Sequence, residues 1–428
     1  MKTTMHAKEQ ENQKTTGTLP AAKEENICLS KIWKENSHLK ELSWFLGEAL
    51  RYTNAIQKPG MGPDIVLLDS SLPLELPLAA GAKTLTLLGG SHAFAEWAGD
   101  LVPRDADAQI RSILGALHAP AGMDFSKSLL VIPLTCDGMR KIAFLLKKEG
   151  FQTFPVDIHP VKGQHQAEKL WEEQLFSLME AIEEHMGKKI TREALSHSRK
   201  VISQAKASLL SFWQMTWDCE KLISPAARLL IRNSFYLARD ISEWSWHLDR
   251  LKEELGRSKR RRGVCDYKPG IMLLGSPVLF PSYKIPFLLQ DCGLSLLDVA
   301  DEYSMALRCM QGKTRLGLGR KECIRQMARE LATLDASPSY VENRSLLRHV
   351  KRLICQGGID GAVLHVLKGQ IEQDFLLPQL EKLLEAENIP LFRLETDYND
   401  HDVEQLRIRM EAFSEMLSQN LYLEAERA

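Results

Sequence analysis

The chain has 428 residues, of which 44% are hydrophobic and 26% are charged, an ordinary composition for a soluble globular protein of roughly two to four domains. Its 55 basic and 56 acidic residues give a net charge of −1, so no overall field directs it to nucleic acid or to a membrane surface. No apolar run reaches the ~18 residues that a membrane-spanning helix needs. Eight cysteines are scattered without a Cys-x-x-Cys pair, which favours a reducing cytoplasm over a secreted disulfide framework.

Residues 1–27 are polar, lack hydrophobic periodicity and contain no apolar core of a secretory signal, so they predict a disordered tail. Residues 29–52, which follow, have the apolar spacing of a helix. Short apolar runs then alternate with helix-length segments, a rhythm that predicts parallel sheets with helices on both faces. The predicted strands are 64–71, 84–90, 129–135 and 151–157 in the first half of the chain, and 270–277, 294–301, 361–367 and 389–397 in the second.

Residues 166–262 differ from both halves, because apolar residues recur every three or four positions without a strand signal. They predict a helical insert whose basic run SKRRRG (258–263) is a solvated end rather than a phosphate site. We interpret its Trp213, Trp217, Trp244 and Trp246 as core residues rather than pocket walls. The predicted fold class is α/β, with two flavodoxin-like parallel-sheet lobes around a helical layer. Its parts are a tail (1–27), an N-terminal lobe with a leading helix (28–165), the insert (166–262) and a C-terminal lobe (263–428).

The residues that follow each predicted strand are the first candidates for a functional site, because ligands of open parallel sheets bind beyond the carboxyl ends of the strands. Polar side chains cluster at these ends in both halves, which predicts a site between the lobes. The thiol of Cys136 can ligate a metal, attack a substrate or fill a hole in the core. His365 and His159 have no second histidine at ligand spacing, so we interpret the first as a core residue and the second as an exposed one. The polar residues after the strands are Ser70, Ser71 and Glu75, then Cys136 and Asp137, then Ser276 and Lys284, then Lys368 and Gln370, and finally Glu395, Asp397 and Tyr398.

Several of these strand ends lie in segments that resemble one known family. SSLPLELPLAAGA (70–82) resembles a P-x-E-L-x-x-A-A-G segment, and LTCDGMRK (134–141) resembles the cysteine–aspartate segment that follows it. Together with later segments, they are similar to the 2-hydroxyacyl-CoA dehydratase family, which also includes benzoyl-CoA reductase subunits, over about residues 60–420. The later segments occur in the family's order and are GSPVLFP (275–281) with Lys284, VADEYSMALR (299–308), IDGAVLHVLKGQ (359–370), IPLFRLETDY (389–398) and RIRMEAFSEML (407–417).

The resemblance implies a cytoplasmic lyase of anaerobic metabolism. In this family each subunit of a dimer holds a [4Fe–4S] cluster through three cysteines, and an ATP-dependent activator protein supplies one electron. The electron reduces the thioester carbonyl of an acyl-CoA to a ketyl radical, which expels the neighbouring hydroxyl group before the electron is recovered. The implied partners are therefore a paralogous subunit, the activator and an acyl-CoA, with no nucleic acid and no membrane.

The family's three cluster cysteines correspond here to Asp107, just before the segment AQIRSILG, to Cys136 and to Gln370. Only one of the three is a thiol, and Ser304 replaces a further cysteine that is common in the family. Iron–sulfur clusters are held mainly by thiolates, and a neutral glutamine is a poor ligand, so we interpret Cys136 as a buried, inert residue. The cysteines closest to the later segments, Cys292 and Cys309, match no ligand position.

The leading hypothesis is a subunit of a 2-hydroxyacyl-CoA dehydratase-type complex that is degenerate at its own [4Fe–4S] site and pairs with a cysteine-complete paralogue. It would supply dimer surface and pocket walls, with Ser71 and Glu75 as candidates for acyl-CoA contacts. One alternative is a cluster-bearing dehydratase or reductase that uses atypical ligands, with Asp107 and Cys136 among them. Another is a non-catalytic protein that binds acyl-CoA or a partner on the same fold.

Overall fold

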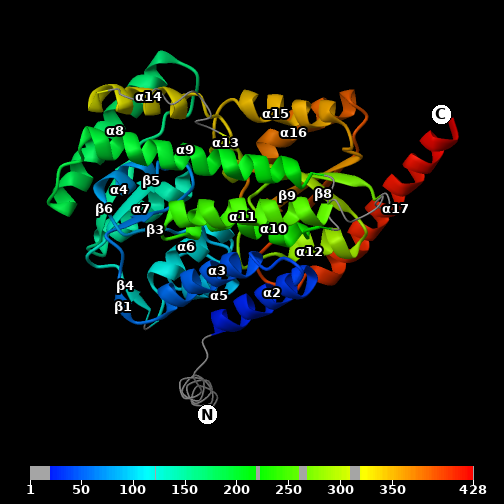
Figure 1. Ribbon diagram of the computed structural model, residues 1–428, viewed down its shortest axis with the longest axis horizontal. Coiled ribbons are helices and arrows are strands. Elements are labelled where there is room, and N and C mark those ends of the chain that lie inside the picture. Colours follow the sequence, from blue (N-terminus) through cyan, green and yellow to red (C-terminus); the bar gives the residue numbers. More distant parts are fainter. Residues whose placement is uncertain (1–19, 121, 218–221, 260–267, 309–318, 428) are drawn as a thin grey trace, which may run out of the picture.

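The computed structural model describes residues 20–120, 122–217, 222–259, 268–308 and 319–427 (Figure 1). Two four-stranded parallel sheets lie at its centre, with the strand orders β3-β2-β5-β6 and β10-β9-β7-β8. When the strands of each sheet are numbered along the chain, their order across the sheet is 2-1-3-4. This is the flavodoxin-like arrangement. The predicted α/β fold with two such lobes is confirmed. The strands are β2 (Ile65–Leu67), β3 (Thr84–Thr86), β5 (Leu129–Pro133), β6 (Gln152–Val156), β7 (Gly270–Gly275), β8 (Ser295–Asp301), β9 (Gly361–Leu367) and β10 (Leu391–Thr396).

Each of the eight predicted strand segments contains one of these strands, because central strands of covered sheets are continuous apolar runs. Every residue of β5 and β9 is buried, for example. A small parallel pair, β1 (Gly60–Met61) with β4 (Met123–Asp124), was not predicted. Two-residue strands are too short to produce a hydrophobic period.

Helices cover both sheets and connect their strands. In the N-terminal half these are α2 (Pro20–Asn36), α3 (Leu42–Gln57), α4 (Glu75–Ala80), α5 (His92–Trp97), α6 (Ala108–Leu117) and α7 (Asp137–Lys148). In the C-terminal half they are α12 (Lys284–Asp291), α13 (Glu302–Arg308), α14 (Arg320–Ala332), α15 (Arg344–Gln356), α16 (Glu372–Ala386) and α17 (Val403–Arg427). The last of these, α17, extends away from the body of the molecule (Figure 1). No helix among the described residues combines the length and the apolar character that crossing a membrane requires.

The predicted disordered tail is too long, because α2 already begins at Pro20. The polar sequence of residues 20–27 hides buried contacts: Gln57 Nε2 of α3 donates to the buried Glu25 carboxylate over 3.1 Å. The single predicted leading helix is also divided into α2 and α3. Its break follows Asn36, whose Nδ2 lies 2.7 Å from Ile32 O and 2.8 Å from Ser224 Oγ.

Residues 165–259 form four helices that contact both lobes. The long helix α9 packs on α4 of the first lobe and α13 of the second, and α10 packs on α3 and α12. The tryptophan prediction is confirmed for the buried Trp213 and Trp244 but is wrong for Trp246, which is 54% exposed. The Arg250 guanidinium lies over the Trp246 ring, 4.7 Å from its centroid. Trp246 therefore contacts solvent and a cation instead of packing in the core. The basic run at 258–263 lies mostly outside the described residues. The helices are α8 (His165–Met186), α9 (Arg192–Met215), α10 (Pro225–Leu237) and α11 (Ile241–Lys259).

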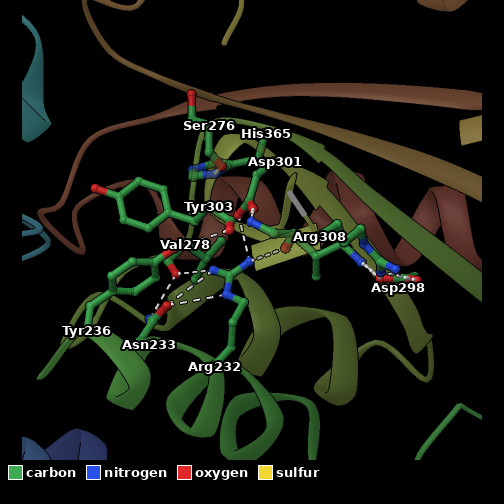
Figure 2. Close-up of polar contacts among 12 residues, drawn as sticks. Arg232, Asn233, Tyr236, Ser276, Val278, Asp298, Asp301, Tyr303, Arg308 and His365 are labelled. Carbon is green, nitrogen blue, oxygen red and sulfur yellow. Dashed lines mark hydrogen bonds and ion pairs between the residues drawn. The ribbon is translucent and has the colours of Figure 1, made fainter. Parts of the chain in front are cut away.

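A buried arginine of α10 joins this helical layer to the second lobe (Figure 2). Arg232, only 2% exposed, donates to Asp301 Oδ2 over 2.7 Å and to Val278 O over 3.0 Å. It also donates over 2.9 Å to Ser304 Oγ, the position where a further cysteine is common in the resembled family. A buried guanidinium is tolerable only when its donors are paired, and here they bind acceptors at the end of β8 and after β7.

Candidate functional site

The carboxyl ends of strands from both sheets meet at a small cavity of about 40 Å³, which we call the acidic cavity. In a flavodoxin-like sheet the order of the strands reverses between the first and the third strand. Ligands bind at the carboxyl ends of these two strands, at this switch point. The acidic cavity lies there in the first lobe, because Asp69 follows β2 and Cys136 follows β5. Glu302 after β8 and Gln370 after β9 contribute its other side.

All three positions that correspond to the family's cluster ligands line the acidic cavity: Asp107, Cys136 and Gln370. Gln370 Nε2 lies 3.2 Å from Asp107 Oδ2 and 3.3 Å from Gln109 Oε1, so its amide joins the two lobes. The other end of the amide is also fixed, because Ser276 Oγ donates to Gln370 Oε1 over 2.6 Å. Two of the three positions that correspond to cluster ligands, Asp107 and Gln370, are therefore hydrogen-bonded to each other.

Backbone packing holds Asp107 against the second lobe. Asp107 caps α6, where its Oδ1 accepts a hydrogen bond from Gln109 N over 2.7 Å. Ala108 N donates to Lys368 O over 3.2 Å, across the lobe boundary. The next residue, Gly369, has φ +89°, and a Cβ there would lie 2.6 Å from Asp107 N. Only glycine combines this φ with so close an approach.

Cys136 caps the other helix of the cavity, α7. Its Sγ accepts a hydrogen bond from Met139 N over 3.5 Å. Burial raises the pKa of the Cys136 thiol to about 12, so the sulfur is protonated at neutral pH. Because the thiolate is the nucleophilic form, Cys136 without a metal ion is a weak nucleophile at this pH.

The acidic cavity carries an excess of carboxyl groups, with no lysine or arginine among its lining residues in the described part of the chain. Burial raises the pKa of Asp107 to about 6. It also raises the pKa of Asp69, and burial together with the charges of Asp69 and Asp301 raises the pKa of Glu302 well above its ordinary value. These groups therefore retain protons that exposed carboxyl groups lose. Among the described residues, no three histidine, cysteine, aspartate or glutamate side chains are placed to hold a metal ion.

Ser71 and Glu75, the candidates for acyl-CoA contacts, line a second cavity of about 20 Å³ rather than the acidic one. This cavity lies beside α9 and α10, where Ile202 and Phe235 form its walls. Ser71 Oγ and both carboxylate oxygens of Glu75 are buried without a hydrogen-bond partner among the described residues. The structure thus separates these two side chains from Cys136.

The other residues considered from sequence have structural contacts. His365 is buried, as predicted, and its Nδ1 lies 2.9 Å from Ser276 O (Figure 2). Burial lowers the pKa of His365 to about 4, so the ring is neutral. His159 is half-buried rather than exposed, because its Nδ1 pairs with the backbone of Val161. Cys292 lies away from the acidic cavity, at the end of α12, and Cys309 lies outside the described residues.

Sequence reasoning missed Asp69, Gln109 and Glu302 as cavity residues. Glu302 follows β8 directly, so its place at a carboxyl end was the available signal, whereas Asp69 lay inside the predicted strand 64–71. Gln109 had no such signal, because it reaches the cavity from the first turn of α6 and donates over 2.9 Å to Tyr303 Oη.

Comparison with known proteins gives independent evidence on the family of the chain. The family model described as 2-hydroxyglutaryl-CoA dehydratase, D-component, matches residues 70–417. The chain is 23% identical over 296 residues to (R)-2-hydroxyglutaryl-CoA dehydratase, subunit beta, of Acidaminococcus fermentans, covering 67% of this chain and 75% of that protein. It is 22% identical over 352 residues to the (R)-phenyllactyl-CoA dehydratase beta subunit of Clostridium sporogenes, covering 81% and 89%.

Proposed function

The chain belongs to the 2-hydroxyglutaryl-CoA dehydratase D-component family, and from this premise we propose that it is a cluster-free subunit of a 2-hydroxyacyl-CoA dehydratase-type complex. A cysteine-complete paralogous subunit holds the [4Fe–4S] cluster, and an ATP-dependent activator reduces it. The names of the two relatives, both beta subunits of dehydratases, support a multi-subunit assembly.

The observation that carries this proposal is the hydrogen bond between Gln370 Nε2 and Asp107 Oδ2, which is 3.2 Å long. It joins two of the three positions that correspond to cluster ligands. The donor set does not fit the cluster. It consists of a carboxyl group, a neutral amide and a single cysteine, whereas such clusters are held mainly by cysteine thiolates. No reaction step is therefore assigned to a cluster on this chain.

The polar network at the acidic cavity instead has a structural role in this proposal. Gln370, Asp107 and Ser276 keep the strand ends of both lobes together at positions that correspond to the family's cluster ligands. The lobes then retain the surface that pairs with the cluster-bearing subunit, and the division into tail, lobes and helical insert serves that assembly. Ser71 and Glu75 supply buried polar groups for an acyl-CoA that the complex binds beside α9 and α10.

Anaerobic purification tests the proposal. The chain is produced alone and together with its cysteine-complete paralogue, and iron and acid-labile sulfide are measured in both samples. We expect the chain alone to hold less than about one iron, and the complex to hold about four, with a broad absorption near 400 nm. Dehydration of a 2-hydroxyacyl-CoA should require the complex, the activator and ATP.

The contrary result is also definite. About four irons on the isolated chain would reject the cluster-free role and favour an enzyme with atypical ligands. A chain that forms no complex with the paralogue would favour a separate binding protein on the same fold.

A further inference from the structure

A second and much larger cavity, of about 860 Å³, lies between the lobes and shares no lining residue with the acidic cavity. We call it the large cavity. Helices α2 and α5 of the first lobe form one side, and α12, the segment after β10 and the start of α17 form the other. Figure 1 shows α2 and α12 next to each other. Its volume is within the range of roughly 300–1,000 Å³ that small-molecule sites occupy.

The position of the large cavity in the fold fits a ligand site. His92 comes after β3 and Tyr398 comes after β10, and both line it. The cavity therefore opens at the carboxyl ends of strands from both sheets, where open α/β folds bind their ligands.

Carboxylates outnumber cations around the large cavity. Its lining includes three cationic side chains, Lys31, Lys284 and Arg407, and five carboxylates. This excess favours a cationic ligand, because an anion would meet more like charges than opposite ones. The five carboxylates are Glu24, Glu96, Asp291, Asp400 and Glu404.

Two of the five carboxylates are paired with cations at one end of the cavity. Lys31 Nζ and Arg407 Nη1 each lie 3.6 Å from Asp291 Oδ2, and Arg407 Nε lies 3.6 Å from Glu404 Oε2. Lys31 Nζ also lies 4.1 Å from the ring centroid of Phe287, which lines the same cavity. At this end the protein itself supplies a cation between a carboxylate and an aromatic ring.

The other three carboxylates have no cationic partner among the described residues. The remaining cation, Lys284, is engaged elsewhere, because its Nζ donates to Asn399 O over 2.5 Å and to Asp402 Oδ1 over 2.8 Å. Lys31 is also too distant, since it lies seven residues from Glu24, or about 10 Å along the axis of α2. The three carboxylates without a cation are Glu24, Glu96 and Asp400.

Two of these carboxylates face each other across the cavity, Glu24 from α2 and Asp400 from the segment after β10. Burial raises the pKa of Glu24 to about 7, although the backbone N–H groups of His92 and Ala93 lower it, and the charge of Asp400 raises it further. A ligand cation between the two carboxylates would remove this repulsion. At pH 8 the ionised form of Glu24 predominates, so both side chains then attract a cation.

Neutral groups beside these carboxylates suit the rest of an organic ammonium ion. His92 Nδ1 is buried without a hydrogen-bond partner among the described residues, so a ligand N–H that donates to it would offset its desolvation cost. Trp97, at the end of the same helix α5, also lines the cavity. In the described part of the chain no cation lies over Trp97, in contrast to Phe287. An indole ring attracts an ammonium group and packs against its carbon skeleton.

We propose that the large cavity binds a primary organic ammonium ion, with the charged group between Glu24 and Asp400 and the carbon skeleton against Trp97. His92 accepts a hydrogen bond from one of the ammonium N–H groups. The proposal does not depend on the cluster-free role, because this binding needs neither iron nor a partner subunit.

Titration calorimetry of the full chain at pH 8 tests the proposal with three probes: phenethylamine, its neutral counterpart 2-phenylethanol, and ammonium chloride. We expect phenethylamine to bind with a dissociation constant on the order of 100 μM, and each of the other two to bind at least about 10-fold more weakly. The alcohol lacks the charge and the ammonium ion lacks the apolar part, so the two comparisons separate the roles of the carboxylates and of the ring.

Two variants assign the binding to this cavity. Glu24→Gln with Asp400→Asn should weaken phenethylamine at least about 10-fold and leave 2-phenylethanol unchanged, because only the charged group loses its partners. Trp97→Leu should weaken both ligands. Glu415→Gln is the matched control, since Glu415 is exposed on α17 and does not line the cavity.

Three outcomes would overturn the proposal: no heat from phenethylamine at about 5 mM, equal affinity for phenethylamine and 2-phenylethanol, or unchanged phenethylamine binding in the double variant. Near-ultraviolet circular dichroism of each variant verifies the fold. The iron content of the same samples reports separately on the cluster-free role, so either idea can fail without the other.

Discussion

The two cavities at the carboxyl ends of the strands use their polar groups in opposite ways. In the acidic cavity the candidate ligands bind one another, as Gln370 does with Asp107 and Ser276. In the large cavity, a separate cavity of about 860 Å³, His92 Nδ1 has no partner among the described residues, and Lys31 Nζ and Arg407 Nη1 each lie 3.6 Å from Asp291 Oδ2. Polar residues at strand ends can therefore satisfy one another, and their presence alone does not mark a ligand site.

The largest expected effect comes from placing cysteine ligands in the acidic cavity, which tests the difference between the two cavities directly. Asp107→Cys with Gln370→Cys would place three thiols around one cavity with Cys136. After anaerobic reconstitution, we expect iron to rise from less than about one to about four per chain, with absorption near 400 nm. Adding Cys136→Ser should abolish the gain. A folded double variant without iron would contradict the idea that the three positions still have the spacing of cluster ligands.

The next largest effect concerns the paired polar interior. Arg232→Met leaves Asp301, which is 2% exposed, without its cation. Breaking a buried ion pair on one side costs about 3–5 kcal/mol, so the free energy of unfolding in urea should fall by that amount. Arg250→Met is the control: Arg250 is 52% exposed and its pair with Glu41 should contribute no more than about 1 kcal/mol. Equal losses in the two variants would mean that burial does not distinguish them.

The acidic cavity also predicts a pH dependence. The pKa of Asp107 is raised to about 6 from an ordinary 3.8, so between these values the folded state binds a proton that the unfolded chain releases. The free energy of unfolding should therefore fall as the pH rises from about 4 to about 7. Asp107→Asn should flatten this curve by about 2–3 kcal/mol, measured by urea titration at several pH values. The exposed Asp137, changed to Asn, is the control, and an unchanged curve in Asp107→Asn would refute the assignment.

The smallest effect concerns the second small cavity. Glu75→Gln keeps the shape of a buried side chain but removes its charge. If Glu75 contacts the acyl-CoA, affinity of the complex should fall roughly fivefold, equivalent to about 1 kcal/mol. Glu180→Gln, on the exposed face of α8, should leave affinity unchanged. Unchanged affinity in Glu75→Gln would remove Glu75 and its neighbour Ser71 from the acyl-CoA site.

The fold was predictable from sequence to the extent that it rests on local apolar runs. Each of the eight strands was found, and so was the helical character of residues 166–259, because burial on both faces and helical spacing leave direct patterns. The start of α2 at Pro20 was not predictable, since it depends on contacts with distant residues such as Gln57. The exposure of Trp246 was not predictable either, because helical spacing alone does not say which apolar positions of α11 face solvent.

The site was predictable only in part, for a related reason. The order of segments identified Asp107, Cys136 and Gln370, but no pattern announces that Gln370 bonds to a residue 263 positions away. Ser71 and Glu75 line a different cavity from Cys136, although Asp69, two residues before Ser71, lines the same cavity as Cys136, and no local pattern distinguishes these positions. The large cavity draws on residues from Glu24 to Arg407, so no single segment contains its signal.

Gly369 lies where the backbones of the two lobes come close together beside the acidic cavity. A methyl group on Gly369 would lie 2.6 Å from Asp107 N and act as a wedge, forcing the halves of the protein to pivot apart without altering any charge. The absence of a side chain at position 369 thus permits the lobes to approach each other here, and any substitution would have to move one of the two backbones.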